Sequence, residues 1–174
     1  ILTFAENNNL ATKNIMRVKN IQPVYFSPTH TSAKIVTAIA EGTDIIVNKE
    51  IDLTYPCADQ KVISTDSLAI IGVPTYAGRV APTALERLQK IKGDNTPAII
   101  VVLYGNRDYE DALLELRDSV KQLGFVPVAG GAFIGEHSYS TEQFPTAAGH
   151  PDVSDIQIAT EFGKNIIKLL NQYA

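Results

Sequence analysis

The sequence is short of cysteine, of net positive charge and of long apolar runs. Its one cysteine, Cys57, excludes an intramolecular disulfide and a cysteine-ligated iron–sulfur cluster or metal site. A single cysteine fits a reducing compartment, so we expect a cytoplasmic protein. The formal net charge of −4 argues against nucleic acid binding, which needs a basic face. The apolar runs fall far short of the roughly 20 residues that span a bilayer, so no membrane contact is predicted.

The length and composition are those of one globular domain. The chain has 174 residues, of which 45% are apolar and 20% charged. The only methionine, Met16, directly precedes the first patterned segment. We expect residues 1–15 to lie upstream of the native start, as an added or leader segment, with an ordinary N-terminal arm as the alternative. Residues 16–174 are then the domain.

Strand-like and helix-like segments alternate along the chain. Strands are predicted at 21–26, 44–53, 68–74, 98–104 and 127–135. Helices are predicted at 31–41, 82–92, 109–123 and 153–172. This alternation indicates an α/β fold with right-handed crossovers and a parallel sheet. Segment 54–67 has no helical period and is predicted to be a loop. Pro23 should lie near the beginning of its strand, because it cannot donate to the ladder.

The segment between the first strand and the first helix is rich in hydroxyl groups. In "SPTHTS", residues 27–32, four of the six residues are Ser or Thr. Ligands of parallel α/β sheets bind beyond the carboxyl ends of the strands, where a following helix presents free N–H groups. One hydroxyl, from Thr31 or Ser32, would suffice to cap that helix. Four hydroxyls favour a cradle of neutral donors for a phosphate dianion.

Three other site types of α/β proteins are missing. The sequence has no GxxxxGK[ST], which argues against a nucleoside triphosphatase, and no GxGxxG after the first strand, which argues against a dinucleotide site. A phosphoacceptor receiver domain needs aspartates at the first and third strands. "VYFSPT" and "IIGVPT" offer none.

"SPTHTS" resembles the phosphate loop of flavodoxins, T/S-x-T-G-x-T, which holds the phosphate of FMN. Ser27, Thr29 and Ser32 fall on its hydroxyl positions, and Thr31 adds a further hydroxyl. His30 stands where flavodoxins have glycine, although histidine adopts a positive φ less readily. His30 is either an extra phosphate donor or an exposed loop residue.

The loops after the third and fourth strands resemble the two flavodoxin loops that flank the flavin ring. The resemblance implies that Tyr76 and Tyr109 stack on the ring, that Gly78 and Gly105 let backbone approach it, and that Asn106 hydrogen-bonds it. The implied cofactor contacts in these loops are Pro74, Thr75, Tyr76, Ala77, Gly78, Arg79, Tyr104, Gly105, Asn106, Arg107 and Tyr109.

Arg79 and Arg107 stand in these loops, where many flavodoxins have acidic residues. A positive charge near the ring favours a negatively charged reduced state. We therefore expect reduction to be easier than in strongly acidic flavodoxins.

The resemblance implies a flavodoxin-like, doubly wound sheet of five parallel strands in the order 2-1-3-4-5, within three layers, α/β/α. It implies an FMN-binding electron carrier that passes one or two electrons between redox partner proteins. An FMN-dependent NAD(P)H:quinone-type reductase is the alternative. No catalytic or metal-binding residue is predicted.

A more specific resemblance rests on "GNRDYEDAL", "GAFIGEHSYS" and "AAGHPD". These resemble flavodoxin domains that precede a two-cluster ferredoxin domain in some anaerobic bacterial and archaeal proteins, so a ferredoxin domain is a possible partner. His137 and Tyr139 are candidates for lining the flavin edge, with a plain surface loop as the alternative. Glu115 and Asp118 are interpreted as a solvated helix face.

Overall fold

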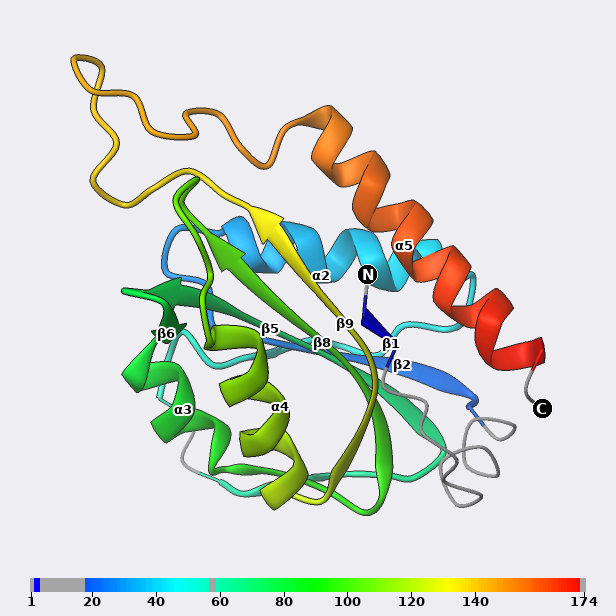
Figure 1. The fold of residues 1–174 in the computed structure, drawn as a ribbon. Helices are drawn as coiled ribbons and strands as arrows, with labels where there is room; N and C mark the ends of the chain where they lie inside the picture. The colour runs from blue at the N-terminus through cyan, green and yellow to red at the C-terminus, as the bar shows by residue number, and fades with distance from the viewer. Residues whose placement is uncertain (1, 4–17, 57–58, 173–174) are drawn as a thin grey trace.

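Five parallel strands form the centre of the molecule, as a computed structural model describes it for residues 2–3, 18–56 and 59–172 (Figure 1). These strands are β2 (Asn20–Tyr25), β3 (Ile51–Asp52), β5 (Ser67–Tyr76), β8 (Thr96–Tyr104) and β9 (Phe125–Ile134). They pair in the order β3-β2-β5-β8-β9, which confirms the predicted order 2-1-3-4-5. The predicted first and third strands, β2 and β5, are therefore parallel neighbours. The order of the strands reverses between them, since β3 lies on one side of β2 and the later strands lie on the other.

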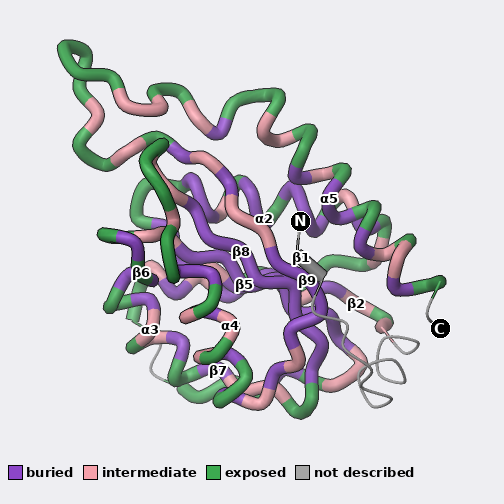
Figure 2. The backbone as a smooth tube through the Cα atoms, in the orientation of Figure 1, coloured by how far each residue is buried: buried purple, intermediate pink, exposed green. Residues whose placement is uncertain are grey.

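Helices cover both faces of this sheet, which confirms the three layers. α2 (Thr31–Gly42) and α5 (Val153–Gln172) lie on one face, and α3 (Pro82–Leu88) and α4 (Ala112–Gln122) lie on the other (Figure 1). The central strands β5 and β8 are buried along nearly all their length, as their continuous apolar runs predict (Figure 2).

Glycines let α2 and α5 approach closely. A Cβ on Gly163 would lie 2.2 Å from the carbonyl oxygen of Ile39, and one on Gly42 would lie 2.0 Å from that of Thr160. Any larger residue would push the helices apart. This contact fixes α2, whose first turn follows the hydroxyl-rich loop.

Two short pairings lie beside the five parallel strands. β6 (Arg79–Val80) pairs antiparallel with the end of β5. β4 (Lys61–Ile63) and β7 (Ile91–Gly93) form a separate parallel pair. The described residues of segment 54–67, which was predicted to be a loop, contain β4 and no helix. The helix predicted at 82–92 ends earlier, at Leu88, because Ile91 belongs to β7.

The second predicted strand, 44–53, is mostly not paired. Only Ile51 and Asp52 form β3, and Val47 makes one isolated bridge to Ile21. Pro23 lies in the middle of β2 rather than near its beginning, so that prediction was wrong. Proline is tolerated at this position because pairing with the segment before β3 is interrupted beside it. The N–H of Ile21 donates to Ile46 O in that segment (2.8 Å). Pro23, two residues further along, faces the same side but has no N–H to donate.

Leu2 and Thr3 form β1, antiparallel to β9 at Gly130 and Ala129. The rest of the predicted N-terminal segment, together with Met16 and Cys57, lies outside the described residues. Within the described part, no helix has both the length and the apolar character needed to cross a membrane.

Candidate functional site

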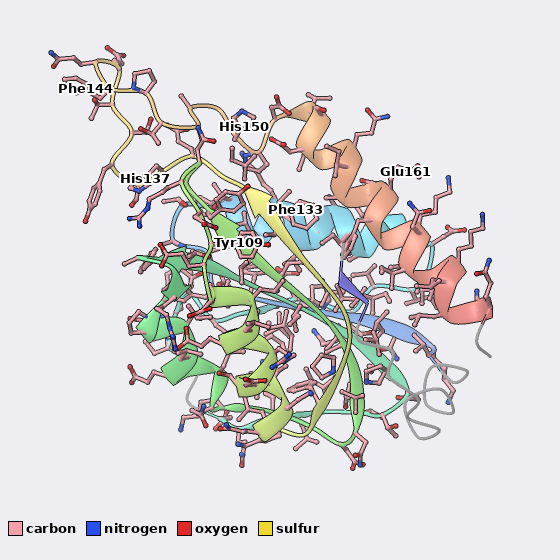
Figure 3. The ribbon with its side chains drawn as sticks, in the orientation of Figure 1. Tyr109, Phe133, His137, Phe144, His150 and Glu161 are labelled. Carbon is pink, nitrogen blue, oxygen red and sulfur yellow. The ribbon has the colours of Figure 1, made fainter. Side chains whose placement is uncertain are left out.

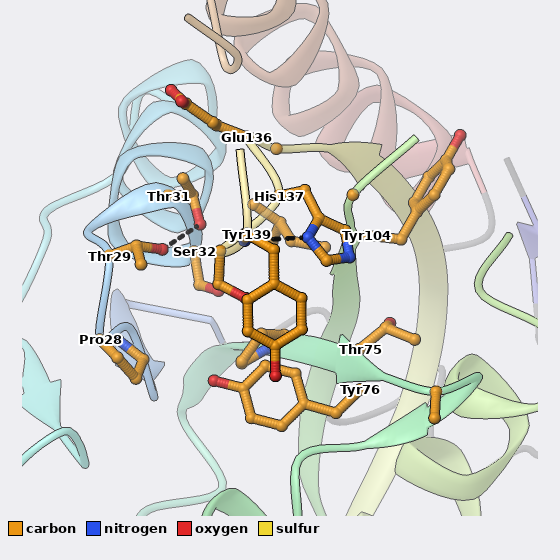
Figure 4. A pocket seen from close by; sticks show the side chains of 16 residues that line it. Pro28, Thr29, Thr31, Ser32, Thr75, Tyr76, Tyr104, Glu136, His137 and Tyr139 are labelled. Carbon is orange, nitrogen blue, oxygen red and sulfur yellow. Dashed lines mark hydrogen bonds between the residues drawn. The ribbon is translucent and has the colours of Figure 1, made fainter. Parts of the chain in front are cut away.

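The carboxyl ends of four parallel strands surround a cavity of about 480 Å³ (Figure 4). Its lining comes from the loops after β2, β5, β8 and β9, where a ligand of a doubly wound sheet is expected. The sequence-predicted residues that line it are Thr29, Thr31, Ser32, Pro74, Thr75, Tyr76, Ala77, Tyr104 and Gly105, and the two candidates His137 and Tyr139. The volume is in the range of sites for small ligands and cofactors.

Ser27 holds the hydroxyl-rich loop to the rest of the fold. Its Oγ accepts a hydrogen bond from the backbone N–H of Ala33 (3.0 Å), and its own N–H donates to Thr54 Oγ1 (2.8 Å). Ser27 is almost fully buried and does not belong to the cavity lining. The first hydroxyl of the motif therefore caps α2 rather than facing the cavity.

His30 has a backbone conformation that glycine adopts more readily than other residues. It precedes α2 with φ 62° and ψ 0°, in the left-handed region, and makes no side-chain capping bond. The side chain is exposed and lies outside the cavity lining, which favours the exposed-loop interpretation. The left-handed conformation that glycine adopts most readily is thus adopted here by histidine.

Two buried hydroxyls at the cavity lack hydrogen-bond partners among the described residues. These are Ser32 Oγ and Thr75 Oγ1. Ser32 is 1% exposed and lies in the first turn of α2. Leaving such a group unpaired costs about 1–3 kcal/mol, so each hydroxyl is suited to a ligand that accepts a hydrogen bond. Thr29 and Thr31 hydroxyls, 3.3 Å apart, bond to each other beside them.

Tyr76 borders the cavity at the end of β5 and is about half exposed (Figure 4). Burial raises the pKa of its phenol, and the nearby Tyr139 raises it further. Tyr76 therefore brings an uncharged aromatic side chain to this side of the cavity.

Tyr109 is not brought to the cavity. Its ring centre lies 5.6 Å from that of Tyr104, tilted by 56°, and it packs against the core beneath α3 and α4. Asn106 and Glu110 have positive φ, so the chain turns on both sides of Tyr109 before α4 begins. The other predicted residues of these loops that do not line the cavity are Gly78, Arg79, Asn106 and Arg107.

Arg79 and Arg107 are paired with carboxylates. Arg79 Nη2 and Nε donate to Glu115 at 2.7 and 3.1 Å, and Glu115 also accepts from the N–H of Val80 (2.7 Å). The bond from Arg79 holds the pKa of Glu115 below its usual range, against the opposing effect of burial. Arg107 Nη2 donates to Glu110 at 2.9 Å.

The interpretation of Glu115 as part of a solvated face was wrong. Its side chain is only 18% exposed and fastens the β5–β6 turn to α4. Asp118 pairs with the neighbouring Arg117 and is 57% exposed, as a solvated face requires.

The loop after β9 supplies much of the lining that the motifs did not indicate. Gly135, Glu136 and Ser138 line the cavity together with His137 and Tyr139. Gly105 is required here, because a Cβ would lie 2.4 Å from Cδ2 and 2.8 Å from Cβ of His137. The glycine that was expected to admit the flavin ring thus admits the His137 side chain.

No family model and no curated protein matches the chain. Solved structures do match. A flavodoxin from the domain Archaea superposes with a TM-score of 0.52 at 12% identity, over 87% of this chain and 99% of that one. The chain has the flavodoxin-like fold. The two-electron reduced flavodoxin of Megasphaera elsdenii gives a TM-score of 0.53 at 11% identity, over 85% and 98%. Rubredoxin oxygen:oxidoreductase of the anaerobe Desulfovibrio gigas gives 0.61 at 16%, over 92% of this chain and 39% of that longer one.

Proposed function

We propose that this chain binds FMN and works as a flavodoxin-like electron carrier between redox partner proteins. The observation that carries the proposal is a pair of buried hydroxyls, Ser32 Oγ and Thr75 Oγ1, which lack hydrogen-bond partners in the described part of the chain and lie in a cavity beside the N-terminus of α2. FMN, when bound, supplies the acceptance and release of one or two electrons. The protein's part is to bind, orient and shield it.

The hydroxyl-rich loop would hold the phosphate. Ser32, Thr29 and Thr31 offer hydroxyl donors, and the first turn of α2 adds N–H groups with a partial positive charge. The N–H of Ala33 is already taken by Ser27, and that of Lys34 by His30 O (3.1 Å). The earlier donors, Thr31 and Ser32, are those that face a ligand.

The opposite half of the cavity would hold the ring. Tyr76 presents an aromatic side chain, and Pro74, Ala77 and Tyr104 also line the cavity. Flat apolar rings with polar edges are stabilised by such walls beyond their simple area burial. Gly78, Arg79, Asn106 and Arg107 would contribute only through the loops that they shape.

Two kinds of partner are proposed for the carrier. One is a separate redox protein, and the other is a ferredoxin domain of the type suggested by the sequence motifs. The single cysteine is compatible with the cytoplasmic location predicted from the sequence.

The test uses purified protein loaded with FMN. We expect a flavin spectrum that persists through gel filtration, and transfer of electrons from the dithionite-reduced protein to cytochrome c. A protein that does not retain FMN overturns the proposal. Rapid turnover of NAD(P)H with a quinone would instead support the reductase alternative, which requires a hydride donor to reach the ring.

A further inference from the structure

We propose that Tyr139, on the loop after β9, takes the place of Tyr109 as the second aromatic side chain against the flavin ring. This inference rests on the proposed FMN binding and adds to it a binding residue from a third loop. Tyr139 would cover the part of the ring that Tyr76 leaves open.

Tyr109 is already engaged in packing. Its ring contacts Tyr104 and the apolar core formed by the sheet with α3 and α4. Moving this ring to the cavity would open a void in the core, and such voids are costly. Tyr109 therefore contributes to the fold beneath the site.

Tyr139 is placed at the cavity but has little other contact. It lines the cavity and yet is 85% exposed, an unusual state for a large aromatic side chain. In the view of Figure 4 its ring overlaps that of Tyr76, and the raised pKa of Tyr76 has Tyr139 as its second cause, so the two phenols lie within electrostatic reach of each other. Tyr76 and Tyr139 thus line the same cavity, and a ligand bound in this cavity would bury part of the exposed Tyr139 side chain.

The loop holds Tyr139 in position before any ligand binds. His137 Nδ1 accepts from the N–H of Tyr139 (3.1 Å), and the two rings lie 5.4 Å apart. The N–H of Ser140 donates to His137 O (2.8 Å). This segment forms a local turn, so little ordering is left to be done on binding.

The base of the loop is also closed. The N–H of Glu136 donates to His150 O (2.8 Å), and that of His137 donates to Thr146 O (3.1 Å). Glu136 accepts from the N–H of Gly149 (3.1 Å). Beyond this base the loop projects from the body of the molecule, with Phe144 at its far end (Figure 3).

A tyrosine over the ring has a consequence for function. It would hinder a bulky hydride donor that needs to lie flat on the same face. Electrons, in contrast, pass through an exposed ring edge without such stacking. The position of Tyr139 therefore favours the carrier over the reductase.

The experiment compares Tyr139→Ala with Tyr109→Ala, using flavin fluorescence quenching to measure Kd for FMN and for riboflavin. We expect Tyr139→Ala to raise both Kd values about five- to tenfold and to reduce quenching, because stacking does not involve the phosphate. Tyr139→Phe should bind as the unchanged protein does. Tyr109→Ala should lower the Tm and change Kd by less than about twofold.

His137 provides a second, gentler test as a positioning residue. His137→Ala should weaken both ligands and reduce quenching without changing the FMN-to-riboflavin ratio. His137→Asn, whose side-chain oxygen can accept the same N–H, should restore the quenching. Unchanged binding in both Tyr139→Ala and His137→Ala, with wild-type FMN binding intact, would overturn the inference alone. Failure of the wild type to bind FMN would overturn the proposed function itself.

Discussion

The two ends of the cavity differ in how they are built. The hydroxyl end comes from one contiguous segment, residues 27–32, and is neutral and largely held in place by the Ser27 cap of α2. The aromatic end is assembled from three loops and is bordered by ion pairs such as Arg79–Glu115. A local motif can specify the first end, whereas the second depends on how distant segments meet. Substitutions should therefore separate phosphate binding from ring binding.

The largest effect is expected at the hydroxyl end. Ser32→Ala removes a buried hydroxyl that has no partner among the described residues, and a hydrogen bond from it to a charged phosphate would contribute about 1.5–3 kcal/mol. The Kd for FMN should rise about 10- to 100-fold, while that for riboflavin stays the same. Calorimetric titration of both ligands measures this difference.

Ser27→Ala is the matched control in the same loop. Because Ser27 caps α2, this variant should lose about 1 kcal/mol of unfolding free energy. Ser32→Ala should lose none, since its hydroxyl has no partner within the described part of the protein. Equal weakening of riboflavin and FMN by Ser32→Ala would contradict the assignment of this end to phosphate.

An intermediate effect is expected at the aromatic end. Gly105→Ala would place a Cβ against His137 and push the loop after β9 away from the cavity. FMN and riboflavin should then weaken together, by about fivefold. Gly135→Ala is a milder variant and should weaken binding less, because its Cβ would make only ordinary contact, 3.4 Å from Thr31 Cβ. A loss confined to FMN would break the proposed division of the site.

A smaller effect should appear in stability. Glu115→Gln weakens the attachment of the β5–β6 turn to α4, and we expect a Tm about 2 °C lower at pH 7. The folded-state pKa of Glu115 lies below its ordinary value of 4.5, so its contribution is complete above pH 4.5 and is lost as the pH falls through that lower value. The Tm difference should therefore close in acid. Asp118→Asn, on the exposed side of α4, is the control and should change the Tm less at pH 7. If Glu115→Gln lowers the Tm by the same amount at pH 3 as at pH 7, the proposed role of the ionised Glu115 is contradicted.

The smallest effect is expected for the charge of the ring loops. Arg107→Ala should lower the midpoint potential of the second reduction step only slightly, because Glu110 already balances Arg107 at 2.9 Å. Glu110→Gln, which leaves the arginine unbalanced, should raise the same midpoint. Redox titration of the FMN-loaded variants measures both. A large fall for Arg107→Ala would show that the pair does not offset the charge.

The buried runs of β5 and β8 follow from local apolar patterns, and the sheet order follows from the resemblance to flavodoxins. The hydroxyl end was foreseen only in part: Thr29, Thr31 and Ser32 line the cavity, whereas the cap of α2 comes from Ser27 and not from Thr31 or Ser32. The aromatic end was predicted only in part. Tyr109 and Tyr139 are both tyrosines in loops after strands, and only packing against Tyr104 separates their roles.

The role of Glu115 was equally hidden. On α4 its position resembles that of any surface carboxylate, and its partners Arg79 and Val80 are more than thirty residues away in the chain. A clue was available in Gly105, since a glycine at the end of a buried strand implies a close neighbour. That neighbour is His137, not a ligand.

The preference for FMN over riboflavin in the unchanged protein tests the account most directly. Calorimetric titration should give a Kd for FMN at least about 100-fold lower than that for riboflavin, since the hydroxyl end would donate several hydrogen bonds to the phosphate, which riboflavin lacks. Equal affinities, or no heat with either ligand, would contradict the account.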